Sequence, residues 1–201
     1  MNDLTEINKL NRKKRGINMD NTKNQKTYCL NTNAKKCLEV AEQCKYAKDS
    51  TRMALGYMAE MAVEDVLRSD YWYPMTTYHF EHDEWDKPDL WEYGLDVGIK
   101  KLSNDGLIWI NFELESNMPQ IIVKLECIKR GKTLNEAVFV PKFFLCYPSD
   151  IIAAEKVYVD GKRAAVRVKN LYPINIGSGQ NLTDILVEKL SDYCTGCPWG
   201  F

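Results

Sequence analysis

The sequence has no excess of charge of either sign and no long apolar run. Its 27 Lys and Arg residues nearly balance its 28 Asp and Glu residues, which gives a formal net charge of −1. Overall charge therefore does not draw the chain to nucleic acid, and any DNA binding must depend on a local patch. No apolar run approaches the about 20 residues that span a bilayer. The polar N-terminus also lacks the apolar core of a signal peptide, so we expect no association with a membrane.

Histidine is scarce, and cysteine is present in an odd number. The two histidines form the pair His79-x-x-His82, for which no third ligand of a zinc site is evident. Seven cysteines in a chain of this size are typical of a reducing compartment, so we expect a cytoplasmic protein. Cys194-x-x-Cys197 would supply half of a structural Zn²⁺ site, which needs four ligands; a redox role lacks a thioredoxin-like βαβ context.

The composition favours one main domain with a polar arm. A chain of 201 residues that is 45% hydrophobic can bury a substantial core. Residues 1–27 are rich in Asn and Lys and are predicted to form a flexible basic arm, whereas residues 28–201 are predicted to form a single domain. One cluster in the arm is either a solubilising tail or a contact for phosphates: Arg12, Lys13, Lys14 and Arg15.

Hydrophobic periodicity predicts helices first and strands afterwards. Apolar residues at helical spacing predict helices over 33–48 and 50–69, the second after an Asp49-Ser50 N-cap. Later segments are predicted as strands over 121–129 and 137–147, a short helix over 151–156, a hairpin over 157–168 and a final helix over 183–191. Pro141 indicates an edge or a bulge in its strand. The predicted fold class is α+β, with a central mixed or antiparallel sheet flanked by helices.

Residues 95–116 have the pattern of a β-hairpin. Apolar and polar residues alternate on both sides of Asp105-Gly106, and Asp-Gly between such runs is a strong hairpin signal. With those two residues as the loop, Val97 faces Leu114 and Asp96 faces Glu115. Because side chains alternate between the faces of a strand, Asp96, Glu113 and Glu115 are predicted to share one face.

Three acids on one face of a hairpin need a compensating partner. Like charges opposed on neighbouring strands are destabilising, so either a hard cation such as Mg²⁺ binds their oxygens, or solvent and neighbouring lysines relieve them. A fourth acid, Glu60, lies between two apolar faces of the helix over 50–69. It is either an ordinary surface residue or a member of the same site.

Together, Gly56-x-x-x-Glu60, Asp96 and Glu113-Leu114-Glu115 resemble the PD-(D/E)xK nuclease superfamily, whose members have a restriction-endonuclease-like core. The resemblance covers about residues 50–116. Glu115 stands where most members have a catalytic Lys; a minority of restriction endonucleases have Glu there and are active, and a catalytically dead descendant is the other interpretation. Pro88-Asp89 is a second literal PD, but Asp96 is preferred because the predicted hairpin places it beside Glu115.

The resemblance implies hydrolysis of DNA phosphodiester bonds with Mg²⁺ or Mn²⁺. Asp96 and Glu113 would hold the cation, Glu60 would hold a second ion or its water shell, and Glu115 would orient or deprotonate the attacking water. The predicted function is therefore a metal-dependent endonuclease.

A local basic patch offers the counterpart for DNA. Its members lie on or beside the predicted hairpin over 157–168: Lys162, Arg163, Arg167 and Lys169. They either contact backbone phosphates or form a solvated hairpin face. The alternative function is a non-catalytic phage or mobile-element binding protein with a nuclease-like fold, which holds a protein or nucleic-acid partner. The sequence leaves open DNA versus RNA and whether a homodimer forms.

Overall fold

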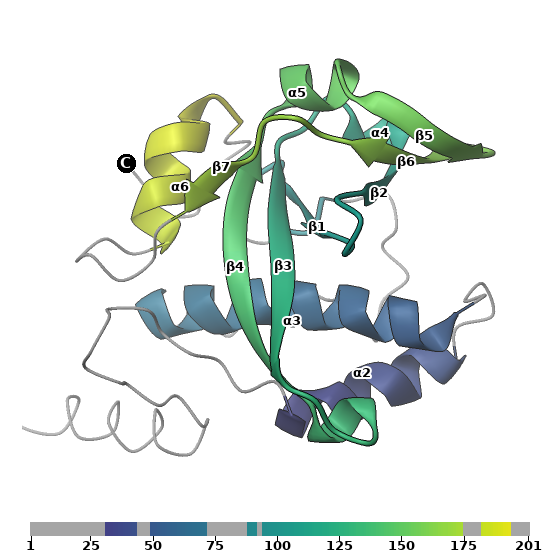
Figure 1. Cartoon of the computed structure of the whole chain (residues 1–201). Helices are drawn as coiled ribbons and strands as arrows, with labels where there is room; N and C mark the ends of the chain where they lie inside the picture. The colour runs from purple at the N-terminus through teal and green to yellow at the C-terminus, as the bar shows by residue number, and fades with distance from the viewer. Residues whose placement is uncertain (1–30, 44–48, 72–87, 92–93, 175–181, 194–201) are drawn as a thin grey trace, which may run out of the picture.

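The computed structural model describes residues 31–43, 49–71, 88–91, 94–174 and 182–193 (Figure 1). Two helices precede the strands, α2 (Asn31–Gln43) and α3 (Ser50–Tyr71), and they pack against each other. The N–H of Arg52 donates to Asp49 Oδ1 over 3.0 Å, which is the N-cap contact expected of Asp before a helix. The predicted helix over 50–69 is confirmed, and the one over 33–48 is confirmed over its described part.

The larger sheet is mixed, as predicted. Its strands are β1 (Gly98–Lys101), β3 (Gln120–Lys129), β4 (Val138–Cys146) and β7 (Tyr172–Ile174), in the order β1-β3-β4-β7. β1 runs parallel to β3, and the other pairings are antiparallel. β7 pairs with β4 only from Phe143 to Leu145, so among the described strands none pairs with β4 at Pro141 on that side, where the missing N–H of proline is tolerated.

The smaller sheet is antiparallel and has the order β2-β6-β5. It contains β2 (Ile108–Asn111), β5 (Glu155–Asp160) and β6 (Arg163–Arg167). β5 and β6 form the predicted hairpin around Asp160-Gly161, and Gly161 has a φ of +59°, the left-handed conformation that such a turn favours. Short helical segments complete the chain: α4 (Phe112–Glu115), η2 (Leu134–Glu136), α5 (Pro148–Ile152), α6 (Leu182–Leu190) and η3 (Ser191–Tyr193).

The predicted hairpin over 95–116 is wrong. The chain does turn there, because Ser103 N–H donates to the Leu107 carbonyl over 2.8 Å and Gly106 has a φ of +79°. The strands then separate: β1 pairs with β3, whereas β2 pairs with β6. The second strand also ends at Asn111, so Glu113 and Glu115 lie on the helix α4 rather than on a strand.

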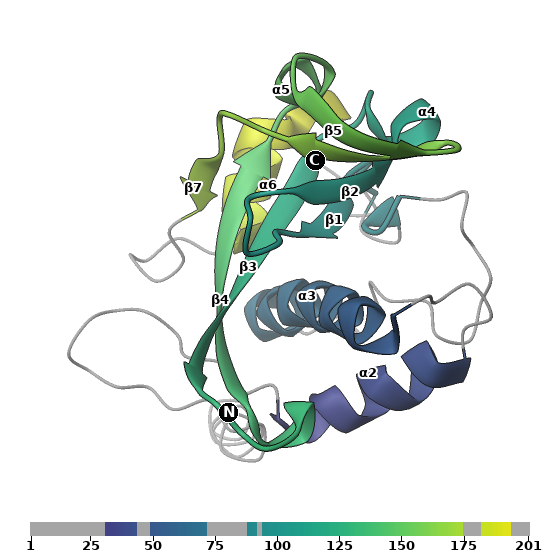
Figure 2. The ribbon, with the colours of Figure 1, turned by 45° about the vertical axis from the view of Figure 1, so that its right-hand side comes forward.

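β3 lies between two hydrophobic clusters and divides the core. Ile121 and Val123 belong to the cluster formed with α2, α3 and α6, whereas Ile122 belongs to the cluster under the smaller sheet. This is the alternation expected of a strand covered on both faces. Figure 2 shows α2 and α3 toward one end of the long β3–β4 pair and the smaller sheet toward the other. Within the described ranges, no helix has both the length and the hydropathy to span a membrane.

Candidate functional site

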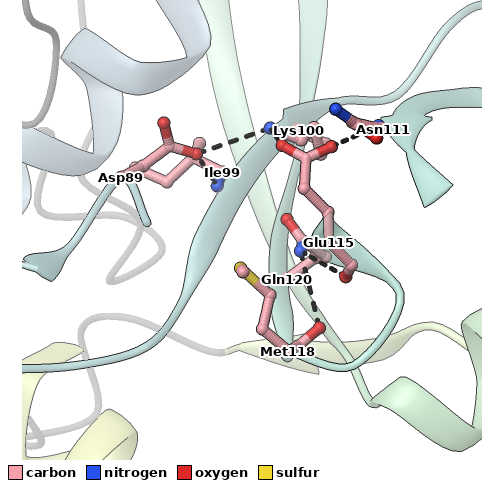
Figure 3. Close-up of polar contacts among 7 residues, drawn as sticks. All are labelled: Asp89, Ile99, Lys100, Asn111, Glu115, Met118 and Gln120. Atoms are coloured by element: carbon pink, nitrogen blue, oxygen red, sulfur yellow. Dashed lines mark hydrogen bonds and ion pairs between the residues drawn. The ribbon is translucent and has the colours of Figure 1, made fainter. Parts of the chain in front are cut away.

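A lysine lies between two carboxylates where β1, α4 and the turn at Asp89 meet (Figure 3). Lys100 Nζ is 2.8 Å from Glu115 Oε1 and 3.5 Å from Asp89 Oδ2. The side chains of all three are largely removed from solvent, with exposed fractions of 17% for Lys100, 22% for Asp89 and 23% for Glu115. We call Asp89, Lys100, Glu115 and the neighbouring Glu60 the carboxylate–lysine cluster.

Backbone groups hold both carboxylates in place. The N–H of Ile99 donates to Asp89 Oδ2, and the N–H of Asn111 donates to Glu115 Oε2, each over 2.5 Å. Hydrogen bonds from N–H groups to a carboxylate are strong because the acceptor is charged. The two acids are thus anchored to β1 and to the end of β2, and their orientation is set before any ligand arrives.

The side chain of Gln120 holds the backbone of Glu115. Its Nε2 donates to the Glu115 carbonyl over 3.2 Å, and the side chain is fully buried. Its register partner on β1 is Gly98, and a Cβ at Gly98 would lie 2.2 Å from Gln120 Oε1. The amide therefore occupies the space that any other residue at position 98 would fill.

Glu60 contributes a carboxyl with a raised pKa. It is a half-buried residue on α3, which packs against β1. Burial is the largest cause of the upward shift, and the negative charges of Asp89, Glu115 and Glu64 add to it, while Lys100 opposes it; the pKa of Glu60 lies well above 4.5. Glu60 thus retains its proton at a higher pH than a solvated glutamic acid does.

Lys100 remains cationic despite its burial. Burial lowers its pKa, but the charges of Asp89 and Glu115 and the hydrogen bond to Glu115 more than offset this effect, and the pKa of Lys100 is raised overall. The cluster therefore contains the carboxylates of Asp89 and Glu115, the ammonium of Lys100 and the Glu60 carboxyl, whose pKa is raised.

The acids predicted from the sequence lie in different places. Glu60 and Glu115 are brought into one electrostatic environment. Glu113, two residues before Glu115, is at the surface and pairs with Lys162 Nζ over 2.8 Å. Asp96 is half-buried before β1, and its N–H donates to the Tyr193 carbonyl over 3.1 Å.

The basic residues and cysteines predicted from the sequence are only partly described. On the smaller sheet and just after it, Lys162, Arg163, Arg167 and Lys169 are exposed. The cluster Arg12 to Arg15, the pair His79 and His82, and the pair Cys194 and Cys197 lie outside the described residues. Three cysteines that are described carry free thiols: Cys37, Cys127 and Cys146.

The donor atoms at the cluster suit a hard cation with few protein ligands. Among the described residues, no three His, Cys, Asp or Glu side chains are grouped to hold a metal ion. Mg²⁺, however, is commonly held by only one or two carboxylates together with water, and Asp89 and Glu115 could supply these. In the described part of the chain, the buried oxygens Asn111 Oδ1 and Gln120 Oε1 lack a hydrogen-bond partner.

Sequence reasoning gave Asp89 and Lys100 lesser roles than the structure does. The sequence pattern includes Lys100 only among the lysines near the acids, and it favours Asp96 over Asp89 because the predicted hairpin places Asp96 beside Glu115. Asp89 lies in a turn, but the Ile99 N–H donates to its carboxylate, which lies beside Lys100. The signal that identifies it is the literal Pro88-Asp89 dipeptide.

Comparison with protein-family models, with curated proteins and with solved structures finds no match for the chain.

Proposed function

We propose that this protein is a metal-dependent phosphodiesterase of the endonuclease type that acts on DNA, with a core related to the PD-(D/E)xK superfamily. The observation that carries the proposal is the ammonium of Lys100 between the carboxylates of Asp89 and Glu115, with Glu60 beside them. Two acids and a lysine are the groups that the superfamily's motif names. In this proposal, Asp89 takes the part that the sequence pattern gave to Asp96, and Lys100 supplies the lysine missing at position 115.

Asp89 and Glu115 would hold the cation. When bound, Mg²⁺ or Mn²⁺ lowers the pKa of a water molecule and neutralises charge on the phosphate. The two carboxylates and Lys100 sum to one negative charge, so a divalent cation changes the sign of the cluster and makes it attractive to a phosphodiester. The N–H groups of Ile99 and Asn111 keep the carboxylates from turning away.

The pKa values of both Lys100 and Glu60 are raised. Lys100 stays charged and can stabilise negative charge on the phosphate or orient the attacking water. Burial and the neighbouring acids raise the pKa of Glu60, which makes it the candidate to donate a proton to the departing oxygen. Burial and neighbouring charges shift the pKa values of both groups. Such shifted pKa values are common at sites of acid–base chemistry.

The second candidate is a non-catalytic binding protein with a nuclease-like fold. It is favoured by the short contact between Lys100 Nζ and Glu115 Oε1, 2.8 Å, because that ammonium already compensates the acid without a metal. In this alternative the cluster only ties β1 to α4.

Cleavage by matched variants separates the two functions. We would incubate plasmid and single-stranded DNA with the protein and Mg²⁺ or Mn²⁺, and compare wild type with Asp89→Asn, Glu115→Gln and Glu113→Gln. Loss of a metal ligand should lower the cleavage rate by at least about 100-fold, because even changes behind the ligands cost roughly 10- to 100-fold.

Glu113→Gln is the matched control. It makes the same chemical change two residues away on α4, at a side chain that is 61% exposed, and should leave the rate unchanged. If wild type cuts neither DNA form with either metal, or if Glu113→Gln abolishes cleavage and Glu115→Gln does not, the proposed function of the cluster is wrong.

A further inference from the structure

The outer face of the smaller sheet carries two aromatic rings in edge-to-face contact. Trp109 on β2 and Tyr158 on β5 both pair with Ala165 on the central strand β6. Because Ala165 is small, the two rings meet above it, with centroids 5.6 Å apart and an interplanar angle of 64°. Ala165 is 1% exposed, whereas Trp109 remains 36% and Tyr158 54% exposed. The rings thus cover the sheet and still present aromatic surface to solvent.

Two arginines lie on either side of this ring pair. Arg163 and Arg167 are two residues before and after Ala165 on β6, so alternation places them on the same face of the sheet. Both are exposed, and their Cα atoms are about 13 Å apart along the strand. The opposite face is the core side, where Ala164 and Val166 are buried.

One end of this face adjoins the strand end that holds the carboxylate–lysine cluster. Arg163 pairs with Asn111 at the end of β2, and the Asn111 N–H donates to Glu115. From the end of β6 that lies beside Asn111, the order along the strand is therefore Arg163, then the two rings over Ala165, then Arg167.

We infer that this face binds single-stranded nucleic acid, with bases stacked on Trp109 and Tyr158 and phosphates held by Arg163 and Arg167. The inference rests on the proposed function for its choice of nucleic acid and deepens it, because it makes a single strand, or the unpaired part of a duplex, the substrate that is led to the cluster. Alternating cationic and aromatic groups match a strand whose phosphates alternate with exposed bases.

The acids on β5 do not cancel this match. Asp160 lies opposite Arg163, and Glu155 lies opposite Arg167. All four residues are exposed, and interactions between exposed charges are weak because water screens them, so the two arginines remain available to phosphates.

The test is binding of a fluorescein-labelled oligothymidylate in EDTA, where no metal supports cleavage, measured by fluorescence anisotropy alongside a duplex of the same length. Trp109→Leu and Tyr158→Leu keep apolar cover over Ala165 but cannot stack. Each should weaken single-strand binding roughly 5- to 100-fold, as expected for loss of a base–aromatic stack. Tyr172→Leu is the control, because Tyr172 is 45% exposed and makes a similar ring contact with Tyr147 away from this sheet.

The arginines are tested by salt dependence. Arg163→Gln and Arg167→Gln should each reduce the slope of log affinity against log salt by about 0.7. Arg130→Gln is the control and should leave the slope unchanged, because Arg130 is an exposed arginine that directly follows the last residue of β3, in the other sheet. Single-strand affinity unchanged in both leucine variants, or no affinity for the oligothymidylate in wild type, overturns the inference. Binding in EDTA is independent of the cleavage assay with Mg²⁺ or Mn²⁺ described above. Binding here with no cleavage there would refute the proposed function alone, and cleavage there without binding here would refute the inference alone.

Discussion

Glu113 and Glu115 lie two residues apart on α4, and each carboxylate is 2.8 Å from the Nζ of a lysine. Their surroundings differ. Glu113 and its partner Lys162 are 61% and 71% exposed, whereas Glu115 and Lys100 are 23% and 17% exposed. Glu115 also accepts from the Asn111 N–H, and its partner is shared with Asp89.

Equal distances therefore conceal unequal interactions. An exposed ion pair is screened by water and contributes little to the free energy of unfolding. Breaking a buried pair is costly, because it leaves an uncompensated charge in the protein interior. We call Glu113–Lys162 the outer pair and Glu115–Lys100 the inner pair. The outer pair lies on the surface of α4, whereas the inner pair holds β1, α4 and the Asp89 turn together. Four predictions test this contrast, from the largest effect to the smallest.

Lys100→Met should have the largest effect. It removes the ammonium between Asp89 and Glu115 and leaves two carboxylates close together, so we expect a loss of about 3–5 kcal/mol in the free energy of unfolding, measured by urea denaturation. Mg²⁺ should restore part of this loss if the two acids can hold a cation. A variant as stable as wild type would show that the inner pair is no more important than the outer one.

Gly98→Ala should disturb the support beneath Glu115. The new Cβ would meet the buried Gln120 amide, and overpacking of this kind costs about 1–3 kcal/mol. Gln120→Ala in the same chain removes the clashing amide, so the double variant should lose less than the sum of the two single changes. Additive losses would mean that the two residues do not act on each other.

Glu60→Gln should change how stability depends on pH. Because the pKa of Glu60 is raised in the folded state, its contribution to stability is fully present below the ordinary value of 4.5 and is lost as pH rises through the folded pKa. Glutamine cannot titrate, so the variant should gain on wild type above that pH, by up to about 1.4 kcal/mol for each unit by which the pKa is raised. Urea denaturation at several pH values measures this, and parallel curves would contradict it.

Lys162→Met should have the smallest effect. The Glu113 carboxylate remains in water when its partner is removed, so the midpoint of urea unfolding should not shift measurably. A shift as large as that of Lys100→Met would remove the distinction between the two pairs.

The sequence predicts those elements whose partners are nearby in the chain. The helix that begins after Asp49 and the hairpin at Asp160-Gly161 are predicted from local capping and turn chemistry, and both are confirmed. The turn at Asp105-Gly106 carries an equally strong local signal, yet its strands pair elsewhere. β1 lies parallel to β3, and parallel pairing has no turn signature in the sequence.

The candidate site is predictable to a similar extent. The sequence offers Glu60 and Glu115 as candidates, because a helix acid at the border of two apolar faces and a clustered acid are both less common than a solvated surface acid. The positions of Asp89 and Lys100 depend on tertiary contacts. The hydrogen bond from the Ile99 N–H orients Asp89. Lys100 lies at the centre of the cluster because β1 packs against α3. Glu113 was included by assuming that β2 continues past Asn111.

Binding of Mn²⁺ measured by titration calorimetry on wild type, Glu115→Gln and Glu113→Gln tests most directly whether the inner carboxylates form the functional centre. We expect wild type and Glu113→Gln to bind with the same affinity, and Glu115→Gln to bind at least about 10-fold more weakly. Equal affinities in all three proteins, or a loss confined to Glu113→Gln, would contradict the assignment.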